Sequence, residues 1–334
     1  MTTTVSFPAL GLEFELNRVA FSIGSFSVYW YGLLIGIGFL LGGVYAMANA
    51  RKVGVDSDRL IDVVMAGLVL GIIGARLYYV AFSWDMYRYD WTKIFDIRQG
   101  GIAIYGGLIA GILGGILMAR VRRVKILPGL DLAAGSFLIG QSIGRWGNFV
   151  NVEAFGSNTS SILGMTGPKV VGYLTQVKAS GAAWAQNIDP NMPVHPTFLY
   201  ESVWCFIGFL LVALVLMPRR KFDGQVFLFY AAWYGTGRFF IEGLRTDSLM
   251  WGGVRVSQAF AALCVVVSVA VYCWVLREKK RRGSSFLPLY VTTAEGQQVV
   301  AGTFYQKAEK PELVLEQPEQ PEDAKPEQDS EQTK

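Results

Sequence analysis

The sequence predicts an all-α polytopic membrane protein, a bundle of about seven transmembrane helices with an extracytoplasmic cap loop. Of its 334 residues, 52% are hydrophobic and only 17% are charged, whereas soluble domains average about 25% charged residues. Long apolar runs recur along the chain, and the basic residues fall in short clusters between them. This composition argues against a simple cytosolic enzyme, and it gives no support to a nucleic-acid partner.

Seven stretches reach the length of about 20 apolar residues that a spanning helix needs. Glycines spaced by four recur in the first four of them, and such small-residue ridges favour close helix packing in lipid. The expected spans are Ser27–Ala50, Leu60–Phe82, Gly101–Ala119, Leu130–Val150, Thr197–Met217, Gln225–Leu244 and Val256–Leu276.

The loops predict the orientation. Loops after the odd-numbered spans carry 15 basic residues and the other loops carry eight. Because basic loops stay in the cytoplasm, we expect the N-terminus outside and the C-terminus in the cytoplasm.

Residues 1–282 would form the transmembrane domain, with the cap loop at about 151–196. Residues 283–334, which hold ten acidic residues and five prolines, would form a largely disordered cytoplasmic tail.

Charged residues inside the spans point to a site. Each costs about 2.5–3.5 kcal/mol on insertion scales, so each needs a reason. Arg76, Arg145 and Arg238 lie in the outer halves of the second, fourth and sixth spans. Glu242 and Arg245 follow Arg238 at i+4 and i+7, on one helical face. Guanidinium groups at headgroup depth suit an oxyanion, and a lipid phosphate is the obvious candidate.

Other polar residues are expected at the same depth, and several of the candidate residues also have a structural interpretation. The arginines could lock helices or form an ion-pair ladder, the tyrosines could anchor at the interface, and the histidine could cap a helix. A single histidine excludes a multi-histidine metal site, and nothing suggests a metal or an organic cofactor. These further residues are Tyr31, Tyr105, Asn148, Asn151, Glu153 and His195.

The stretch GRWGNFVNVEAFG at residues 144–156 resembles the signature of the prolipoprotein diacylglyceryl transferase family. Supporting similarities are FSIGSFSVYWYG, GARLYY, YGGLIAG, HPTFLYE and GRFFIEGLRTD. The resemblance covers about residues 21–277 and leaves the acidic tail outside.

The resemblance implies an enzyme of the bacterial inner membrane, surrounded by membrane lipids. It would transfer the diacylglyceryl group from phosphatidylglycerol to the lipobox cysteine thiol of a prolipoprotein signal peptide, forming a thioether and releasing glycerol phosphate. Catalytic positions would be Tyr105, Arg145, Glu153 and Arg238. Phosphatidylglycerol would be bound by Tyr31, Arg145, Asn148, Asn151, Gly156, Arg238, Glu242 and Arg245.

One position departs from the family pattern, because many relatives have a histidine where this chain has Tyr105. A phenol is a poor base near neutral pH, since its reference pKa is about 10. The thiol proton could go to a Tyr105 activated by arginine, to water or Glu153, or to His195. We favour a mainly electrostatic mechanism in which Tyr105 is not the base. An inactive paralogue, a lipid or anion transporter and a non-catalytic lipid-binding scaffold are the alternatives.

Overall fold

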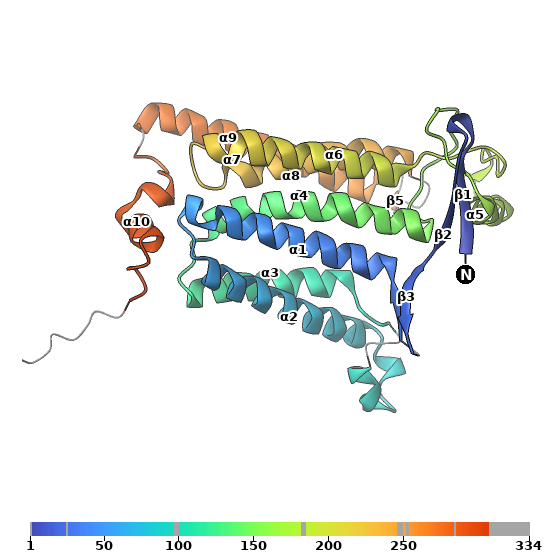
Figure 1. The fold of residues 1–334 in the computed structure, drawn as a ribbon, viewed down its shortest axis with the longest axis horizontal. Coiled ribbons are helices and arrows are strands. Elements are labelled where there is room, and N and C mark those ends of the chain that lie inside the picture. Colours follow the sequence, from blue (N-terminus) through green and yellow to red (C-terminus); the bar gives the residue numbers. More distant parts are fainter. Residues whose placement is uncertain are drawn as a thin grey trace, which may run out of the picture.

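The computed structural model describes residues 2–24, 26–96, 100–181, 185–245, 250–251, 254–283 and 285–306. Long helices run side by side, with a cap of strands and loops at one end and short C-terminal helices at the other (Figure 1). Six helical stretches are long and apolar enough to cross a membrane, which confirms the polytopic all-α class. They are α1 (Trp30–Ala50), α2 (Ser57–Phe82), α3 (Ile104–Val121), α4 (Ile126–Asn151), α6 (Thr197–Leu211) with the π-helical turn Val212–Leu216 and α7 (Met217–Arg219), and α9 (Val256–Arg282).

The remaining predicted span corresponds to α8 (Gln225–Leu244), which is outside that apolar set. It packs in the bundle against α4, α6 and α9. Its start is held by the fully buried Asp131 of α4, which accepts hydrogen bonds from the backbone N–H groups of Gly224 (2.9 Å) and Phe227 (3.0 Å). These bonds satisfy donors that a helix N-terminus leaves open, so a buried carboxylate fixes α8 against α4.

The centre of the bundle is α4. In the most apolar stretch of α4, 39% of the residues are buried, whereas the corresponding share is 17% in α1, α2, α3 and α9. The predicted glycine ridges of α2 and α3 lie at their mutual contact, whereas in α1 the contact is made by Gly38 and not by the predicted Gly32 and Gly36, which have open space around them. A Cβ on Gly38 of α1 would lie 3.1 Å from the Gly140 oxygen of α4, and one on Gly67 of α2 would lie 3.2 Å from the Gly111 oxygen of α3. The absence of side chains therefore allows these backbones to touch.

Arg76 of α2 holds the loop that joins α2 to α3. Only 7% of Arg76 is exposed, and its guanidinium donates to backbone carbonyls at 2.6 to 3.1 Å. The accepting residues are Lys93, Ile94, Asp96, Gly100 and Gly101. The role supported by these contacts is the structural one, with loop carbonyls as the partners.

The cap combines the N-terminal hairpin with the connection between α4 and α6. Strand β1 pairs antiparallel with β2, so that Phe7 lies opposite Leu12. Helix α5 packs on β1 around a core that includes Val5, Val170 and Leu174, all fully buried.

The strands and helix α5 have the following bounds: β1 (Thr2–Phe7), β2 (Leu12–Asn17), β3 (Val19–Ile23), β4 (Phe26–Tyr29), α5 (Pro168–Ala179), β5 (Met250–Trp251) and β6 (Val254–Arg255). Turns of 3-10 helix span Pro8–Leu10, Arg51–Val53, Trp84–Met86, Trp91–Phe95 and Tyr290–Thr292.

The first part of the stretch expected as a tail is folded. Residues 285–306 form a 3-10 turn and α10 (Ala294–Val300), at the end of the bundle opposite the cap (Figure 1). The backbone N–H of Tyr290 donates to the Asp223 carboxylate at 2.6 Å, which joins this segment to the α7–α8 loop. The remainder of the expected tail, residues 307–334, lies outside the described residues.

Candidate active site

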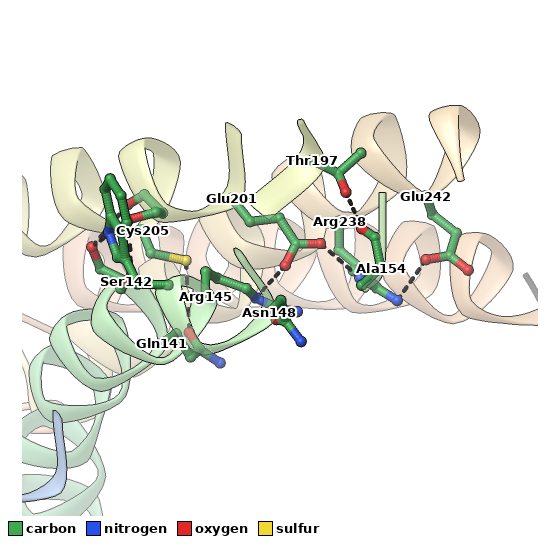
Figure 2. Close-up of polar contacts among 12 residues, drawn as sticks. Gln141, Ser142, Arg145, Asn148, Ala154, Thr197, Glu201, Cys205, Arg238 and Glu242 are labelled. Carbon is green, nitrogen blue, oxygen red and sulfur yellow. Dashed lines mark hydrogen bonds and ion pairs between the residues drawn. The ribbon is translucent and has the colours of Figure 1, made fainter. Parts of the chain in front are cut away.

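Three helices bring four charged side chains into one network near the capped end (Figure 2). Glu201 of α6 lies between two guanidinium groups, and its Oε1 atom accepts from Nη1 of Arg238 at 2.7 Å. Its Oε2 atom forms an ion pair with Nε of Arg145, which comes from α4. The second terminal nitrogen of Arg238 is 2.5 Å from the carboxylate of Glu242, one turn further along α8. The predicted arginines of spans four and six are therefore joined through a shared carboxylate.

Burial divides this network by charge. The side chains of Glu201 and Glu242 are 5% and 3% exposed, whereas those of Arg145 and Arg238 are 22% and 20% exposed. Carboxylates are stable at such depth only when paired and hydrogen-bonded. The carboxylates thus lie in the buried part of the site, and the guanidinium groups form its accessible part.

Arg145 has unused donors. Its Nε atom is the nitrogen nearest to Glu201, and within the described parts of the chain neither terminal nitrogen donates a hydrogen bond. A guanidinium presents its donors in a rigid fork that matches two oxygens of a phosphate or carboxylate. Arg145 is therefore oriented by one carboxylate while two nitrogens stay available for an anion.

Paired side-chain contacts fix the spacing between α4 and α6. The Ser142 hydroxyl donates to the Ser202 carbonyl at 2.9 Å, and the Ser202 hydroxyl donates to the Ser142 carbonyl at 2.8 Å. The indole N–H of Trp146 donates to the Ser202 hydroxyl at 3.1 Å. Ser202 is next to Glu201, and Ser142 and Trp146 lie within one turn of Arg145. These contacts therefore hold the two charged groups at a set separation.

A second reciprocal pair fixes α6 against α8. The indole rings of Trp204 and Trp233 stack with centroids 4.2 Å apart, and each indole N–H donates to the other residue's carbonyl at 2.9 to 3.0 Å. A Cβ on Gly237 would lie 2.4 Å from the Trp204 ring. A glycine next to Arg238 therefore allows the close packing that brings Arg238 to Glu201.

The polar residues at the end of α4 form an adjoining cluster. Val152 has φ of 49° and Ala154 has φ of 56°, so the chain reverses sharply where the helix ends. The reversal brings the exposed Glu153 carboxylate to the amide N–H groups of Asn148 (3.0 Å) and Asn151 (3.3 Å). Because Asn148 lies three residues after Arg145 on the same helical face, this cluster borders the arginine site.

Two basic side chains to which the sequence analysis assigned no role in the site border the same cluster. Lys169 of α5 and Arg18 both donate to the backbone carbonyl of Asn151, Arg18 at 3.4 Å. The pKa of Lys169 lies below its usual value because of partial burial first and the Arg18 charge second, with Glu153 opposing the shift. These two residues extend positive charge from the bundle to the cap.

Gly156 connects the cap loop to the end of α8. Its N–H donates to the His195 carbonyl at 2.9 Å, and it forms an antiparallel bridge with Arg245. A Cβ at this position would lie 2.8 Å from the Cβ of His195 and 2.9 Å from the Leu244 oxygen. Glycine is thus required for the loop and the helix end to approach each other.

Tyr31, at the start of α1, contacts α4 beside the cluster. A Cβ on Gly147 would lie 2.6 Å from its ring, so the ring rests on the backbone next to Asn148. The side of Tyr31 away from α4 is open, because 38% of the residue is exposed. Its position is compatible with a wall of the predicted pocket.

Tyr105 and His195 are placed differently. Tyr105 is 63% exposed in the first turn of α3, a helix that packs on α2, and no contact of the described residues joins it to the arginine network. His195 shares a hydrogen bond of 3.2 Å between its Nδ1 atom and the Tyr200 hydroxyl. Burial lowers the pKa of His195 below its usual value, so its ring is neutral near pH 7.

Sequence reasoning missed Glu201, which the structure places at the centre of the site. The signal was present, because Glu201 is an ionisable residue within the fifth apolar run and stands in the HPTFLYE motif. The cost of burying a charge that singled out the arginines applies equally to this carboxylate.

The fold and this network define a polytopic α-helical membrane protein with two arginines paired to one buried glutamate near one end of the bundle. A family model described as prolipoprotein diacylglyceryl transferase matches residues 18–274, and the chain belongs to that family.

The chain is also similar to curated relatives named phosphatidylglycerol–prolipoprotein diacylglyceryl transferase. It is 43% identical to those of Bacillus cereus (strain G9842) and Bacillus anthracis (strain CDC 684 / NRRL 3495) over 263 residues, which is 78% of this chain and 92% of each relative. The relative from Bacillus cereus (strain B4264) is 43% identical over 258 residues, 76% of this chain and 90% of its own length.

Proposed function

We propose that this protein transfers the diacylglyceryl group of phosphatidylglycerol to the thiol of a lipobox cysteine in a prolipoprotein. The observation that carries the proposal is the open fork of Arg145, held by Glu201 beside Arg238, in a chain of the prolipoprotein diacylglyceryl transferase family. The names of the relatives support the two substrates.

The proposed reaction is a displacement at an sp3 carbon. The cysteine sulfur attacks the glycerol carbon that bears the phosphate ester, so a C–S bond forms and a C–O bond breaks. The bonding electrons stay on the phosphate oxygen, and glycerol phosphate leaves as an anion. The thiol must lose its proton, because the thiolate is the nucleophile.

Arg145 and Arg238 stabilise the leaving phosphate. Negative charge grows on the phosphate oxygens as the C–O bond breaks, and oriented cationic donors lower the energy of that state. Glu201 is a positioning residue: by pairing with Arg145 through Nε, it leaves the terminal nitrogens for the substrate. Because Glu201 also binds Arg238, it sets both guanidinium groups relative to one phosphate.

The remaining predicted residues form the proposed phosphatidylglycerol pocket. Asn148, Asn151 and Glu153 would contact the glycerol headgroup, and Tyr31 would line its wall. Gly156 would hold the loop near Arg245, and Glu242 would orient Arg238. We assign no proton transfer to Tyr105, because its described contacts lie at the α2–α3 pair and away from the arginines. The mechanism is then mainly electrostatic, with water or Glu153 accepting the thiol proton.

The proposed setting is a bacterial inner membrane, with the capped end facing out and the C-terminus in the cytoplasm. In this orientation the arginine site lies at the depth of outer-leaflet headgroups. Both substrates would reach it from the membrane.

A reconstitution with defined substrates tests the proposal. The purified protein in nanodiscs containing phosphatidylglycerol should add the mass of a diacylglyceryl group to a lipobox peptide. A peptide with serine in place of the lipobox cysteine is the matched control and should gain no mass. A folded protein that modifies neither peptide would contradict the proposal and would favour a transporter, a lipid-binding scaffold or an inactive relative.

A further inference from the structure

A cavity of about 410 Å3 lies at the end of the bundle opposite the arginine site, between the α3–α4 turn and the C-terminal segment. Its walls are mostly apolar and include Val124, Leu127 and Pro288, with Arg120 and Lys125 among the polar lining residues. We propose that this cavity binds the phosphate of an anionic phospholipid from the leaflet at that end. The C-terminal wall lies beyond residue 274, where the match to the family model ends.

The cavity is located where lipid headgroups lie. Arg120 is in the last turn of α3 and Lys125 directly precedes α4, and both helices are long and apolar enough to span a membrane. Ile126 and Leu127, which also line the cavity, are 37% and 45% exposed. Apolar surface next to basic side chains at a membrane boundary matches a phospholipid, which carries its phosphate next to its glycerol and acyl chains.

Two polar groups at the cavity lack partners. The Arg120 side chain is exposed, and it has no hydrogen bond or ion pair in the described parts of the chain. Tyr290 is 8% exposed, and its hydroxyl is buried without a hydrogen-bond partner. Buried polar groups are nearly always satisfied in proteins, so an unpartnered hydroxyl in a cavity that a free guanidinium also lines indicates a missing polar ligand.

The charge around the cavity favours an anion. Arg120 and Lys125 line the cavity, whereas Arg122 of the same turn is paired with Asp62. The acidic wall residue Asp223 accepts from the Tyr290 N–H at 2.6 Å through Oδ2. Its buried Oδ1 atom has no hydrogen bond and lies 3.7 Å from Nε of Arg220. The lining therefore holds two basic residues against one acidic residue, which favours an anionic ligand.

Glu295 of α10 acts as a competitor within the chain. Its carboxylate lies 3.0 Å from the Lys125 ammonium, which also lies 5.2 Å from the centroid of the Tyr290 ring. Both partners of this pair are half exposed, with side-chain exposures of 50% and 55%. A lipid phosphate that reaches Lys125 replaces Glu295, so lipid binding and the Lys125–Glu295 pair exclude each other.

Because of this competition, substitutions of Lys125 and of Glu295 should change lipid binding in opposite directions. Native mass spectrometry of the full chain would measure binding of phosphatidic acid, an anionic lipid without the glycerol headgroup, with phosphatidylcholine as the neutral probe. Arg120→Gln and Lys125→Gln should each weaken phosphatidic acid binding about fivefold. Glu295→Gln should strengthen it, because Lys125 is released. Arg219→Gln is the matched control, since Arg219 is an exposed basic residue outside the cavity lining.

The outcomes separate a lipid site from a structural ion pair. If Lys125 served only to pair with Glu295, then Lys125→Gln and Glu295→Gln would change lipid binding in the same direction, and the proposal would be wrong. It would also be wrong if the cavity variants matched Arg219→Gln. Should Lys125→Gln fail to fold, Glu295→Gln still decides, because unchanged or weaker phosphatidic acid binding by that variant would overturn the proposal.

Discussion

Glu201 Oε1 lies 2.7 Å from Arg238 Nη1, across the contact between α6 and α8. The other oxygen of the same carboxylate pairs with Arg145 of α4. A negative group between two like-charged guanidinium groups offsets part of their repulsion and so stabilises their approach. The relationship between Glu201 and Arg238 therefore connects the packing of three helices to the proposed chemistry.

Glu201→Gln is expected to reduce diacylglyceryl transfer strongly and to destabilise the protein. Removing one member of a buried ion pair leaves the other charges uncompensated and costs about 3 kcal/mol. The peptide mass assay and thermal unfolding in detergent would measure the two effects. Asp85→Asn is the matched control, because Asp85 forms an exposed ion pair with Arg88 at 3.3 Å, and such pairs contribute little. Equal behaviour of the two variants would contradict the role of Glu201.

Arg145→Ala should abolish thioether formation while the protein still inserts into the membrane. Arg145→Lys should also lose at least about tenfold in rate, because an ammonium cannot pair with Glu201 and present a planar fork at once. Rates of peptide modification, normalised to folded membrane protein, would check both variants. Transfer from phosphatidylglycerol at wild-type rates by the alanine variant would remove Arg145 from the site.

Tyr105→Phe should retain measurable transfer activity. The substitution removes only the phenolic oxygen, which lies on an exposed residue of α3 that has no described contact with the arginine network. The rate would be compared with that of wild type across pH 6 to 9. Complete loss of activity in a folded variant would assign the hydroxyl a catalytic role and would require movement of α3 toward α4.

Gly156→Ala should impair both stability and transfer. Its methyl group would meet the His195 Cβ at 2.8 Å and the Leu244 oxygen at 2.9 Å, so the cap loop would have to move from the end of α8. Overpacking of this kind costs about 1–3 kcal/mol. Gly115→Ala is the matched control, since a Cβ there meets nothing within 4 Å. Unfolding midpoints that are the same for both variants would show that the contact is not needed.

His195 should make stability depend on mildly acidic pH. Burial lowers the pKa of His195 in the folded protein, whereas the unfolded histidine titrates near its ordinary value of about 6.5. Above that pH both forms are neutral and the full stability is present. As pH falls below it, the unfolded chain binds the proton first, so stability is lost.

The unfolding midpoint of wild type should therefore fall more between pH 7 and pH 5 than that of His195→Gln. Differential scanning fluorimetry at matched ionic strength would measure the difference. Parallel declines in the two proteins would show that the environment of His195 does not disfavour its charged form.

Much of the helical frame could be predicted along the chain, because the length of an apolar run is a local property. The predicted boundaries of the span from Thr197 to Met217 lie within two residues of the helical stretch that ends at Arg219. The third span was placed less well: α3 begins at Ile104 instead of Gly101, since the preceding glycines adopt φ of 91° at Gly100 and 77° at Gly101. Local conformation of this kind is not visible in hydropathy.

The amino-acid sequence alone determined which residues were too polar for lipid, and so identified Arg145 and Arg238 as unusual. Only the tertiary structure decided their partners, because a carboxylate 56 positions from Arg145 and 37 from Arg238 meets them only after α4, α6 and α8 pack. It also decided that Arg76 binds loop carbonyls and that Tyr105 lies apart. The physical reason is that burial cost depends on a residue and its segment. Pairing depends instead on helix contacts, which serine and tryptophan side chains and glycines far apart in the chain determine.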